Sequence, residues 1–375
     1  MSRRLRSTAA VTAITTAIGL SLISLAAVPA NAGPPSDETV TVATGLNNPR
    51  QLSVGPGQRI YVAEAGIADV CEAIPGVGPE FQVCGLTGSV TEVSRTGQRR
   101  VVTDLPTLDF NGEVVGASDV DVQGNSIAVL IGGMAAASTA RDDLGDEYAA
   151  FGTLRTGSLR SAPVAGADLE LVADVLAYEV ANNPDGNVPP DSNAVGFTSL
   201  GGQHWAVTDA GGNTLLSVGH GSESTVAIFP DGDPVPSPFG GPDISPEAVP
   251  TDVAVGPDGA YYVSQLTGFP FPTDASSIWR VTPEGEATVY ATGLTMVTSL
   301  EWRGDTLYAV QLDDSNFFDG HVGSLRRITA GGSEHEAVAS GLSAPYGVAI
   351  QGHWAYLTVD SVSSGDGSVI RVDLR

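Results

Sequence analysis

Positive charge is scarce in this 375-residue sequence, and lysine is absent from it. The 17 basic residues are all arginine and face 43 acidic residues, so the formal net charge is −26. A protein this acidic repels phosphate backbones and anionic lipid headgroups. We therefore expect neither a nucleic acid nor, once the leader described below is removed, a membrane as its partner. The acidity alone is typical of a soluble exported protein and identifies no ligand.

Cysteine is also scarce, since Cys71 and Cys84 are the only two. Their spacing fits neither the CxxC redox motif nor a zinc-binding pattern, which argues against a catalytic or metal-binding thiol pair. In an oxidising compartment, two cysteines so close in sequence are expected to form a disulfide that closes a short loop. Such a disulfide stabilises a folded protein by roughly 3 kcal/mol.

Long apolar runs are missing except near the N-terminus, at residues 9–28. This run follows Arg3, Arg4 and Arg6 and precedes Ala30-Asn31-Ala32, an order typical of a secretory signal. We predict cleavage after Ala32, a secreted extracellular protein, a short linker at residues 33–38 and one domain at residues 39–375. An uncleaved membrane anchor is the alternative, but threonine and serine residues dilute the run.

A phrase of two strand-like segments joined by a glycine-containing turn recurs along the rest of the chain. Tyr262, Tyr308 and Tyr356 occupy equivalent positions and lie 46 and 48 residues apart. That period is typical of a propeller blade and not of a helical repeat. The six copies begin near residues 52, 119, 197, 253, 299 and 348.

Further strand-like segments complete each copy, except that the last segment, residues 368–375, has nothing after it. The N-terminal strand at residues 40–43 is expected to fill that place and to remove both open sheet edges. We therefore predict an all-β fold, a six-bladed β-propeller closed by pairing the N-terminal strand into the last blade. The only helix expected in the domain lies within residues 134–151.

In such a blade, the residue before the inner strand and the residue that ends the second strand meet at the mouth of the central channel. Several of these residues carry carboxyl groups around a single arginine, a combination that attracts cations or polyhydroxy ligands. Polar residues are also ordinary at strand ends, so a purely structural role stays open. The ligand-binding candidates at this mouth are Arg50, Glu64, Asp119, Asp209, Asp252 and Gln265.

The loop at residues 182–193 adds Asn183, Asp185 and Asn193 to the candidates. Their carboxylate and amide oxygens would suit a hard cation, and calcium is the one cofactor that the sequence brings into question. The loop lacks the Asp-x-Asp-x-Asp-Gly pattern, and these residue types are the ordinary chemistry of turns. We favour a turn and predict no metal ligand there.

Catalytic motifs are absent. The five histidines fall in or beside expected hairpin turns, and neither a Gly-x-Ser-x-Gly elbow nor a His-Glu-x-x-His helix occurs. We therefore predict no catalytic residue.

Several phrases together resemble the ScyD/ScyE family of secreted propellers. They include GLNNPR at residues 45–50, YVAEAG at 61–66, NPDG at 183–186, DSN at 191–193, DAGGN at 209–213 and LTGFPFP at 266–272. The resemblance covers nearly all of the chain after residue 44 and implies a six-bladed, NHL-like or TolB-like exported propeller. The chain departs from the family pattern at Ala194-Val195, at Gln265 and at Gln311. The resemblance transfers no catalytic residue.

Two functions are consistent with these observations. The first is a secreted, non-enzymatic binding or scaffold propeller whose partner is a small molecule, a glycan or a protein. The alternative is a metal-dependent hydrolase or lactonase resembling the regucalcin/gluconolactonase group, with a cation in the channel that polarises a carbonyl. Its nearest ligand candidates are Glu64, Asp119, Asn193 and Asp252. Under the first hypothesis, replacing Asp119 and Asp252 together should abolish binding without unfolding the protein.

Overall fold

The computed structural model describes residues 39–375 apart from residues 75–80, 134–140, 142–143 and 316–319. All of the described residues belong to the unit Ala32–Arg375. The predicted leader at residues 1–32 and the linker at residues 33–38 lie outside the described residues. Within the described part of the chain, no helix has both the length and the apolar composition needed to cross a membrane.

In two copies of the repeated phrase, the turn needs glycine for a steric reason. A Cβ atom on Gly256 would lie 2.3 Å from the ring of Tyr262, and one on Gly55 would lie 2.5 Å from the ring of Tyr61. Real Cβ atoms do not approach other atoms this closely, so a side chain at either position would displace the ring. The glycine and the aromatic residue after the turn are therefore two parts of one hairpin.

Six sheets, each named here by its first strand, account for most of the fold. In hydrogen-bonded order, the β2 sheet contains β2 (Pro49–Gly55), β3 (Arg59–Glu64), β6 (Gly88–Ser94), β7 (Gly97–Leu105) and β13 (Val164–Ala165). The β10 sheet contains β10 (Ala117–Gln123), β11 (Ser126–Ile131), β12 (Thr153–Ser158) and β14 (Glu170–Asp174), and the β15 sheet contains β15 (Ala194–Gly201), β16 (His204–Asp209), β17 (Thr214–Gly219) and β18 (Ser222–Ile228). The β19 sheet contains β19 (Pro250–Val255), β20 (Tyr261–Gln265), β21 (Ser276–Val281) and β22 (Ala287–Leu294), and the β23 sheet contains β23 (Val297–Arg303), β24 (Thr306–Gln311), β25 (Val322–Arg327) and β26 (Glu336–Ser343). The β27 sheet contains β27 (Val348–Gln351), β28 (Trp354–Val359), β29 (Ser364–Asp373) and β1 (Val40–Asn47).

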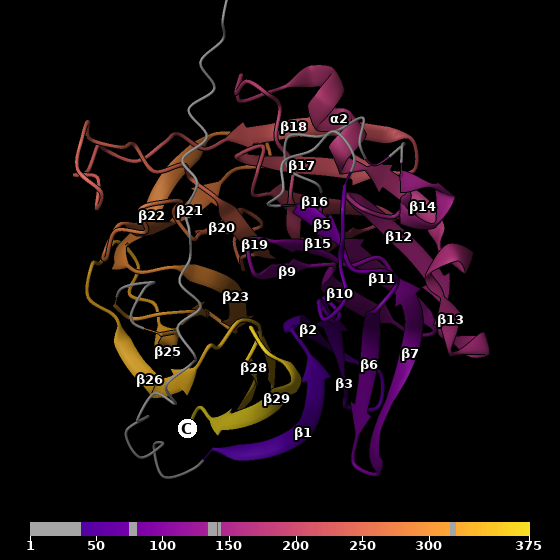
Figure 1. Ribbon diagram of the computed structural model, residues 1–375. Coiled ribbons are helices and arrows are strands. Elements are labelled where there is room, and N and C mark those ends of the chain that lie inside the picture. The colour runs from indigo at the N-terminus through magenta and orange to yellow at the C-terminus, as the bar shows by residue number, and fades with distance from the viewer. Residues whose placement is uncertain (1–38, 75–80, 134–140, 142–143, 316–319) are drawn as a thin grey trace, which may run out of the picture. The chain divides into compact units, whose positions relative to one another are not determined.

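Neighbouring strands in these sheets are antiparallel, except that the short β13 runs parallel to β7. The first strands contact one another in the order β2, β10, β15, β19, β23 and β27, and β27 contacts β2 again. The first described strand, β1, pairs with β29 near the C-terminus, with Val40 opposite Arg371. Figure 1 shows the indigo β1 beside the yellow β29. The all-β fold predicted from the repeats is confirmed.

The apolar core lies between neighbouring sheets. Leu52 and Ile60 of the β2 sheet pack with Ala349 and Val369 of the β27 sheet. In the same way, residues of the β15 sheet pack against the β19 sheet. Each of these sheets therefore buries apolar side chains against its neighbour, which explains why so many strand residues in the repeats are aliphatic.

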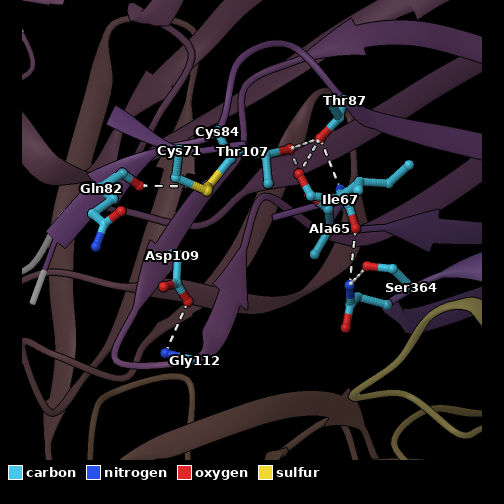
Figure 2. Close-up of a disulfide and its surroundings, with 12 residues drawn as sticks. Ala65, Ile67, Cys71, Gln82, Cys84, Thr87, Thr107, Asp109, Gly112 and Ser364 are labelled. Atoms are coloured by element: carbon cyan, nitrogen blue, oxygen red, sulfur yellow. Dashed lines mark hydrogen bonds between the residues drawn. A yellow bond between two sulfur atoms is a disulfide. The ribbon is translucent and has the colours of Figure 1, made fainter. Parts of the chain in front are cut away.

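A seventh, smaller sheet carries the disulfide. Its strands are β4 (Glu72–Ala73), β5 (Phe81–Val83), β8 (Leu108–Phe110) and β9 (Glu113–Val115). The rings of Phe81 and Phe110 stack at 4.5 Å between centroids. Cys71 and Cys84 are joined beside this sheet, with their Cα atoms 4.2 Å apart (Figure 2). The predicted disulfide is confirmed.

The expectation that residues 134–151 hold the only helix is wrong, because helix α2 spans Val175–Asn182. A carboxylate oxygen of Asp174 accepts a hydrogen bond from the N–H of Ala177 and so caps the helix. Asn183, with φ of 43°, ends the helix in the left-handed conformation. Residues 134–140 and 142–143 lie outside the described part. Short turns of the 3-10 type also occur among the described residues, namely η1 (Asp146–Tyr148), η2 (Leu159–Ser161) and η3 (Gly166–Asp168).

Candidate functional site

A cavity of about 410 Å³ is lined by residues from the first strand of each of the six sheets. We call it the central channel. Four carboxyl groups line it, from Asp119, Asp121, Asp252 and Glu301. Among the described residues that line the channel there is no arginine or histidine, and the chain has no lysine. The channel therefore gathers four acidic side chains and, among its described lining residues, no basic one.

Asp119 connects two sheets. One of its carboxylate oxygens accepts a hydrogen bond of 2.7 Å from the N–H of Val120 in its own strand. The other accepts a hydrogen bond of 2.8 Å from the N–H of Phe197, which lies in β15 of the next sheet.

Asp252 has the same role two sheets further on, in β19. Its Oδ1 accepts from the N–H of Val253, and its Oδ2 accepts from the N–H of Leu300 and the hydroxyl of Ser299 in β23. These two carboxylates line the channel and also hold neighbouring sheets together.

Burial makes the channel carboxyl groups weak acids. It raises the pKa of Asp252 to about 6 and that of Glu301 to about 8, against the opposing effect of hydrogen bonds from the backbone. Burial, with the nearby charge of Asp252 second, raises the pKa of Asp119 well above its usual range. The pKa of Asp121 is also raised, again chiefly by burial. A cation in the channel would favour the ionised forms and lower these pKa values.

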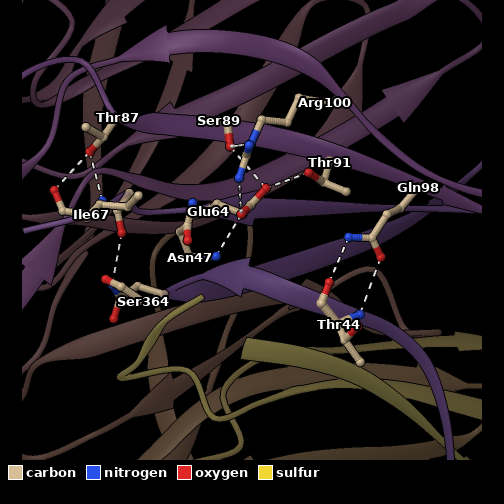
Figure 3. A network of polar contacts seen from close by, with 12 residues as sticks. Thr44, Asn47, Glu64, Ile67, Thr87, Ser89, Thr91, Gln98, Arg100 and Ser364 are labelled. Carbon is tan, nitrogen blue, oxygen red and sulfur yellow. Dashed lines mark hydrogen bonds and ion pairs between the residues drawn. The ribbon is translucent and has the colours of Figure 1, made fainter. Parts of the chain in front are cut away.

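Glu64 lies outside the channel, in a closed polar network at the end of β3. Its carboxylate accepts hydrogen bonds from the N–H of Asn47 at 2.8 Å and from the hydroxyls of Ser89 and Thr91 at 3.0 and 2.5 Å. Arg100 completes the network at 3.4 Å (Figure 3). The contact with Asn47 joins β1 to the β2 sheet, and the other three contacts join β3 to β6 and β7 within that sheet, so the buried Glu64 side chain stabilises the fold.

Arg50 is also occupied by protein groups. Its guanidinium donates to the main-chain carbonyls of Ser361 and Val114 at 2.9 and 2.6 Å and lies 5.0 Å from the centre of the Tyr346 ring. Burial raises the pKa of Tyr346 to about 12. Arg50 and Asn193 both line a separate small cavity of about 20 Å³, which has room for little more than a water molecule.

Asp209 and Asp185 lie in the region where α2, the loop after it and the β16–β17 turn meet. Asp209 accepts hydrogen bonds from the hydroxyl of Ser192 and the N–H of Asn193, both at 2.7 Å. Asp185 accepts from the side-chain amide of Asn213 at 3.1 Å. The phrases NPDG, DSN and DAGGN, which all lie within residues 183–213, are thus brought together. Asn183 also belongs to this region, where its side-chain amide donates to the carbonyl of Asn187.

Glu179 of α2 reaches into the same region. Its side chain is nearly inaccessible, with 1% of the residue exposed, and its Oε1 has no hydrogen-bond partner among the described residues. A Cβ atom on Gly212 would lie 2.7 Å from Oε2 of Glu179 and 3.2 Å from Oδ2 of Asp209, so both carboxyl groups face this glycine. Burial, followed by the charge of Asp209, raises the pKa of Glu179 to about 8.

The structure therefore distributes the predicted mouth residues over several places. Gln265, the remaining candidate, accepts a hydrogen bond from the indole N–H of Trp279 at 3.1 Å. Of the candidates, Asp119 and Asp252 line the central channel; Arg50 and Asn193 line the small cavity; Glu64 lies in the network of the β2 sheet; Asn183, Asp185 and Asp209 lie near α2. Across the described residues, no group of three or more Asp, Glu, His or Cys side chains is arranged to hold a metal ion.

Sequence reasoning missed Asp121, Glu301 and Glu179. The first two could have been found, because residues two apart in a strand face the same side. Asp121 follows the candidate Asp119 by two, and Glu301 follows by two Ser299, near which the fifth copy of the repeat begins. Each therefore shares the channel face with a residue at the start of an inner strand. Glu179 could not be found in this way because its helix was not predicted.

Comparison with known proteins identifies the fold but no family. No family model matches the chain, and no curated protein matches it. Among solved structures, the chain is similar to a glucose dehydrogenase with 12% identity, over 89% of this chain and 99% of the other, at a TM-score of 0.52. It is also similar to virginiamycin B lyase from Staphylococcus aureus, with 11% identity, over 90% of this chain and 99% of the other, at a TM-score of 0.47. A putative gluconolactonase shows 12% identity over 90% of this chain and 93% of its own length, at a TM-score of 0.48.

Identities this low carry information on the fold alone. The likeness to the glucose dehydrogenase and the six sheets around a central channel identify a β-propeller. The activities of these proteins do not transfer to the chain.

Proposed function

We propose that the chain is an exported, ligand-binding β-propeller of the ScyD/ScyE type, with six blades closed by β1. The order of contacts among the first strands, which returns from β27 to β2, supports six blades. The pairing of β1 with β29 supports closure through the N-terminal strand. The basic and apolar N-terminal segment supports export, with cleavage after Ala32.

The ligand that best suits the central channel is a small cation. The observation that carries this proposal is the set of four carboxyl groups in a cavity of about 410 Å³ whose described lining has no basic side chain. A cavity of this size accommodates a small organic molecule or a partly hydrated metal ion. A positive charge placed there would offset the mutual repulsion and the burial of the carboxylates.

Asp121 and Glu301 are the residues best placed to contact the ligand. The side chain of Asp121 accepts a hydrogen bond from Gln123 in its own strand, at 2.9 Å. In the described part of the chain, neither Asp121 nor Glu301 makes the bonds between sheets that occupy Asp119 and Asp252. Replacing these two residues therefore tests binding without removing a connection between sheets.

Titration calorimetry of the purified protein with 1,4-diaminobutane and, separately, with calcium tests the proposal. We expect one of the two cations to bind in a saturable manner. The double variant Asp121→Asn/Glu301→Gln should weaken that binding at least tenfold. The control Glu284→Gln/Glu286→Gln removes two exposed carboxylates from the β21–β22 turn, which does not line the channel, and should change the affinity less than twofold.

The two cations distinguish an organic amine from a metal as the source of the charge. Failure of both cations to bind would refute the channel as a cation site. Equal loss of affinity in both double variants would show only a general effect of net charge, and would refute it as well.

The positions of the ligand candidates do not favour the alternative of a metal-dependent hydrolase. Of its four ligand candidates, Asp119 and Asp252 line the channel, whereas Glu64 lies in the network with Arg100 and Asn193 lines the small cavity. In the described residues these four side chains do not form one ligand set. We therefore favour binding over catalysis.

A further inference from the structure

A second cavity, of about 620 Å³, lies between the β2 sheet and the β27 sheet. We call it the lateral pocket. Its wall on the β27 sheet includes His353, Trp354, Tyr356 and Arg371, and Arg95 contributes from the β2 sheet. The pocket is therefore partly aromatic and partly basic.

The charge of the lateral pocket is opposite to that of the molecule. Two of its lining residues are arginines, and no Asp or Glu is among the described residues that line it. The whole chain carries a formal charge of −26. A basic pocket on such a protein selects anions locally, while the surrounding charge repels polyanions such as nucleic acid.

Arg371 has an unused hydrogen-bonding group. On β29, it lies opposite Tyr356, and its guanidinium lies over the ring of Trp354 at 4.4 Å. Its Nε is buried and donates no hydrogen bond to the described residues. No hydrogen bond or ion pair of the Arg371 side chain occurs in that part of the chain, whereas Arg95 donates to Gln58 at 3.0 Å. Buried donors are nearly always paired, so an unpaired one beside a cavity indicates a missing acceptor.

We propose that the lateral pocket binds a small carboxylate carried on a six-membered ring. A guanidinium donates two parallel hydrogen bonds to a carboxylate, and Arg371 has its donors available for this. The rings of Trp354 and Tyr356 offer flat apolar surface against which the ligand ring can pack. The volume of the pocket lies within the range usual for small-molecule sites. This site is separate from the central channel and does not rest on the function proposed for it.

Calorimetric titration of the purified protein with matched pairs of probes tests the proposal. One pair is 4-hydroxybenzoate and its neutral amide, 4-hydroxybenzamide; the other is D-glucuronate and D-glucose. We expect at least one carboxylate to bind ten times more tightly than its neutral partner. The pair that shows the larger preference distinguishes an aromatic acid from a sugar acid.

Two single variants locate the binding. Arg371→Gln should weaken carboxylate binding at least tenfold and should leave the weak binding of the neutral partner unchanged. Arg160→Gln removes an exposed arginine from η2 and should change carboxylate binding less than twofold. If its melting curve shows that Arg371→Gln does not fold, Arg95→Gln is used in its place. We expect Arg95→Gln to cause a smaller loss of carboxylate affinity.

The proposal is overturned if neither carboxylate binds better than its neutral partner. It is also overturned if a folded Arg371→Gln variant binds the carboxylate as well as the unaltered protein does. The comparison between carboxylate and neutral probe needs no variant, so the proposal can be tested even if every substitution destabilises the protein.

Discussion

The carboxylate of Asp252 accepts a hydrogen bond of 2.8 Å from the main-chain N–H of Leu300, which belongs to the neighbouring sheet. Asp119 has the same relationship with Phe197. The equivalent positions in two sheets thus use one device, a carboxylate at the start of the first strand that holds the first strand of the next sheet. The channel walls owe part of their rigidity to these two side chains.

We expect Asp252→Ala to lower the free energy of unfolding by about 2–3 kcal/mol, because it leaves buried N–H groups of Val253 and Leu300 without an acceptor. Urea denaturation measures the loss. Asp305→Ala, in an exposed turn of the β23 sheet, serves as the control and should change stability by less than about 0.5 kcal/mol. A loss equally small in Asp252→Ala would contradict the structural role. The double replacement of Asp119 and Asp252 should therefore destabilise the protein, contrary to the expectation from sequence.

Because of Glu179, the free energy of unfolding should fall as the pH rises. Its pKa in the folded protein is about 8, above the ordinary value of 4.5, so the folded state holds a proton that the unfolded state has released. The stabilisation is complete below pH 4.5 and is lost progressively up to about pH 8. Glu179→Gln keeps the neutral form at every pH and should raise the melting midpoint above that of the unaltered protein by about 2 °C at pH 9, but not at pH 4. The measurement is a series of melting curves across this range, with the exposed Glu170→Gln as control. A gap between Glu179→Gln and the unaltered protein that is the same at every pH would contradict the raised pKa.

The disulfide should stabilise the protein by about 3 kcal/mol, since it closes a loop between residues 13 apart. The variant Cys71→Ser/Cys84→Ser should show this loss in urea denaturation. Reduction of the unaltered protein should produce a loss of the same size. If neither treatment changes the midpoint, the β4–β5–β8–β9 region is held by its other contacts, such as the stacked Phe81 and Phe110.

Gly256→Ala should lower the free energy of unfolding by about 1–3 kcal/mol, because the new Cβ would collide with the ring of Tyr262. Combining it with Tyr262→Leu should relieve the collision, so the double variant should be more stable than the sum of the two single effects predicts. Denaturation of all four proteins measures the coupling. Strict additivity would show that the glycine and the tyrosine are independent.

The repeated strands could be predicted because they depend on local signals. Alternating apolar residues and a glycine turn before an aromatic residue are visible in the sequence around Gly256 and Tyr262, and the structure gives their steric reason. The sequence also indicated that residues 40–43 would pair with the last strand, because the last copy of the repeat lacks a fourth strand. In the structure, β1 pairs with β29. Helix α2 could not be predicted as readily, because its eight residues continue directly from strand β14 and contain β-branched Val175 and Val180.

The grouping of the candidate residues could not be read from their positions in the repeat. Glu64 ends the second strand of its sheet and Asp252 lies near the start of the first strand of another, and both positions were predicted at one mouth. Glu64 is instead enclosed by Ser89, Thr91 and Arg100, whereas Asp252 reaches the channel. The difference depends on which polar side chains the neighbouring strands present. Those neighbours are set by tertiary packing and by register shifts, such as the one between Pro250 and Asp252.

The pairing of β1 with β29 has a consequence for how the protein reaches its folded state. These two strands lie at opposite ends of the described chain, so bringing them together requires almost the longest loop that the chain can form. Contacts this distant in sequence form slowly, because the entropy of loop closure is lost before the contact compensates for it. The β27 sheet should therefore be the last to assemble, and until then the edge of β29 stays open to pairing with other chains.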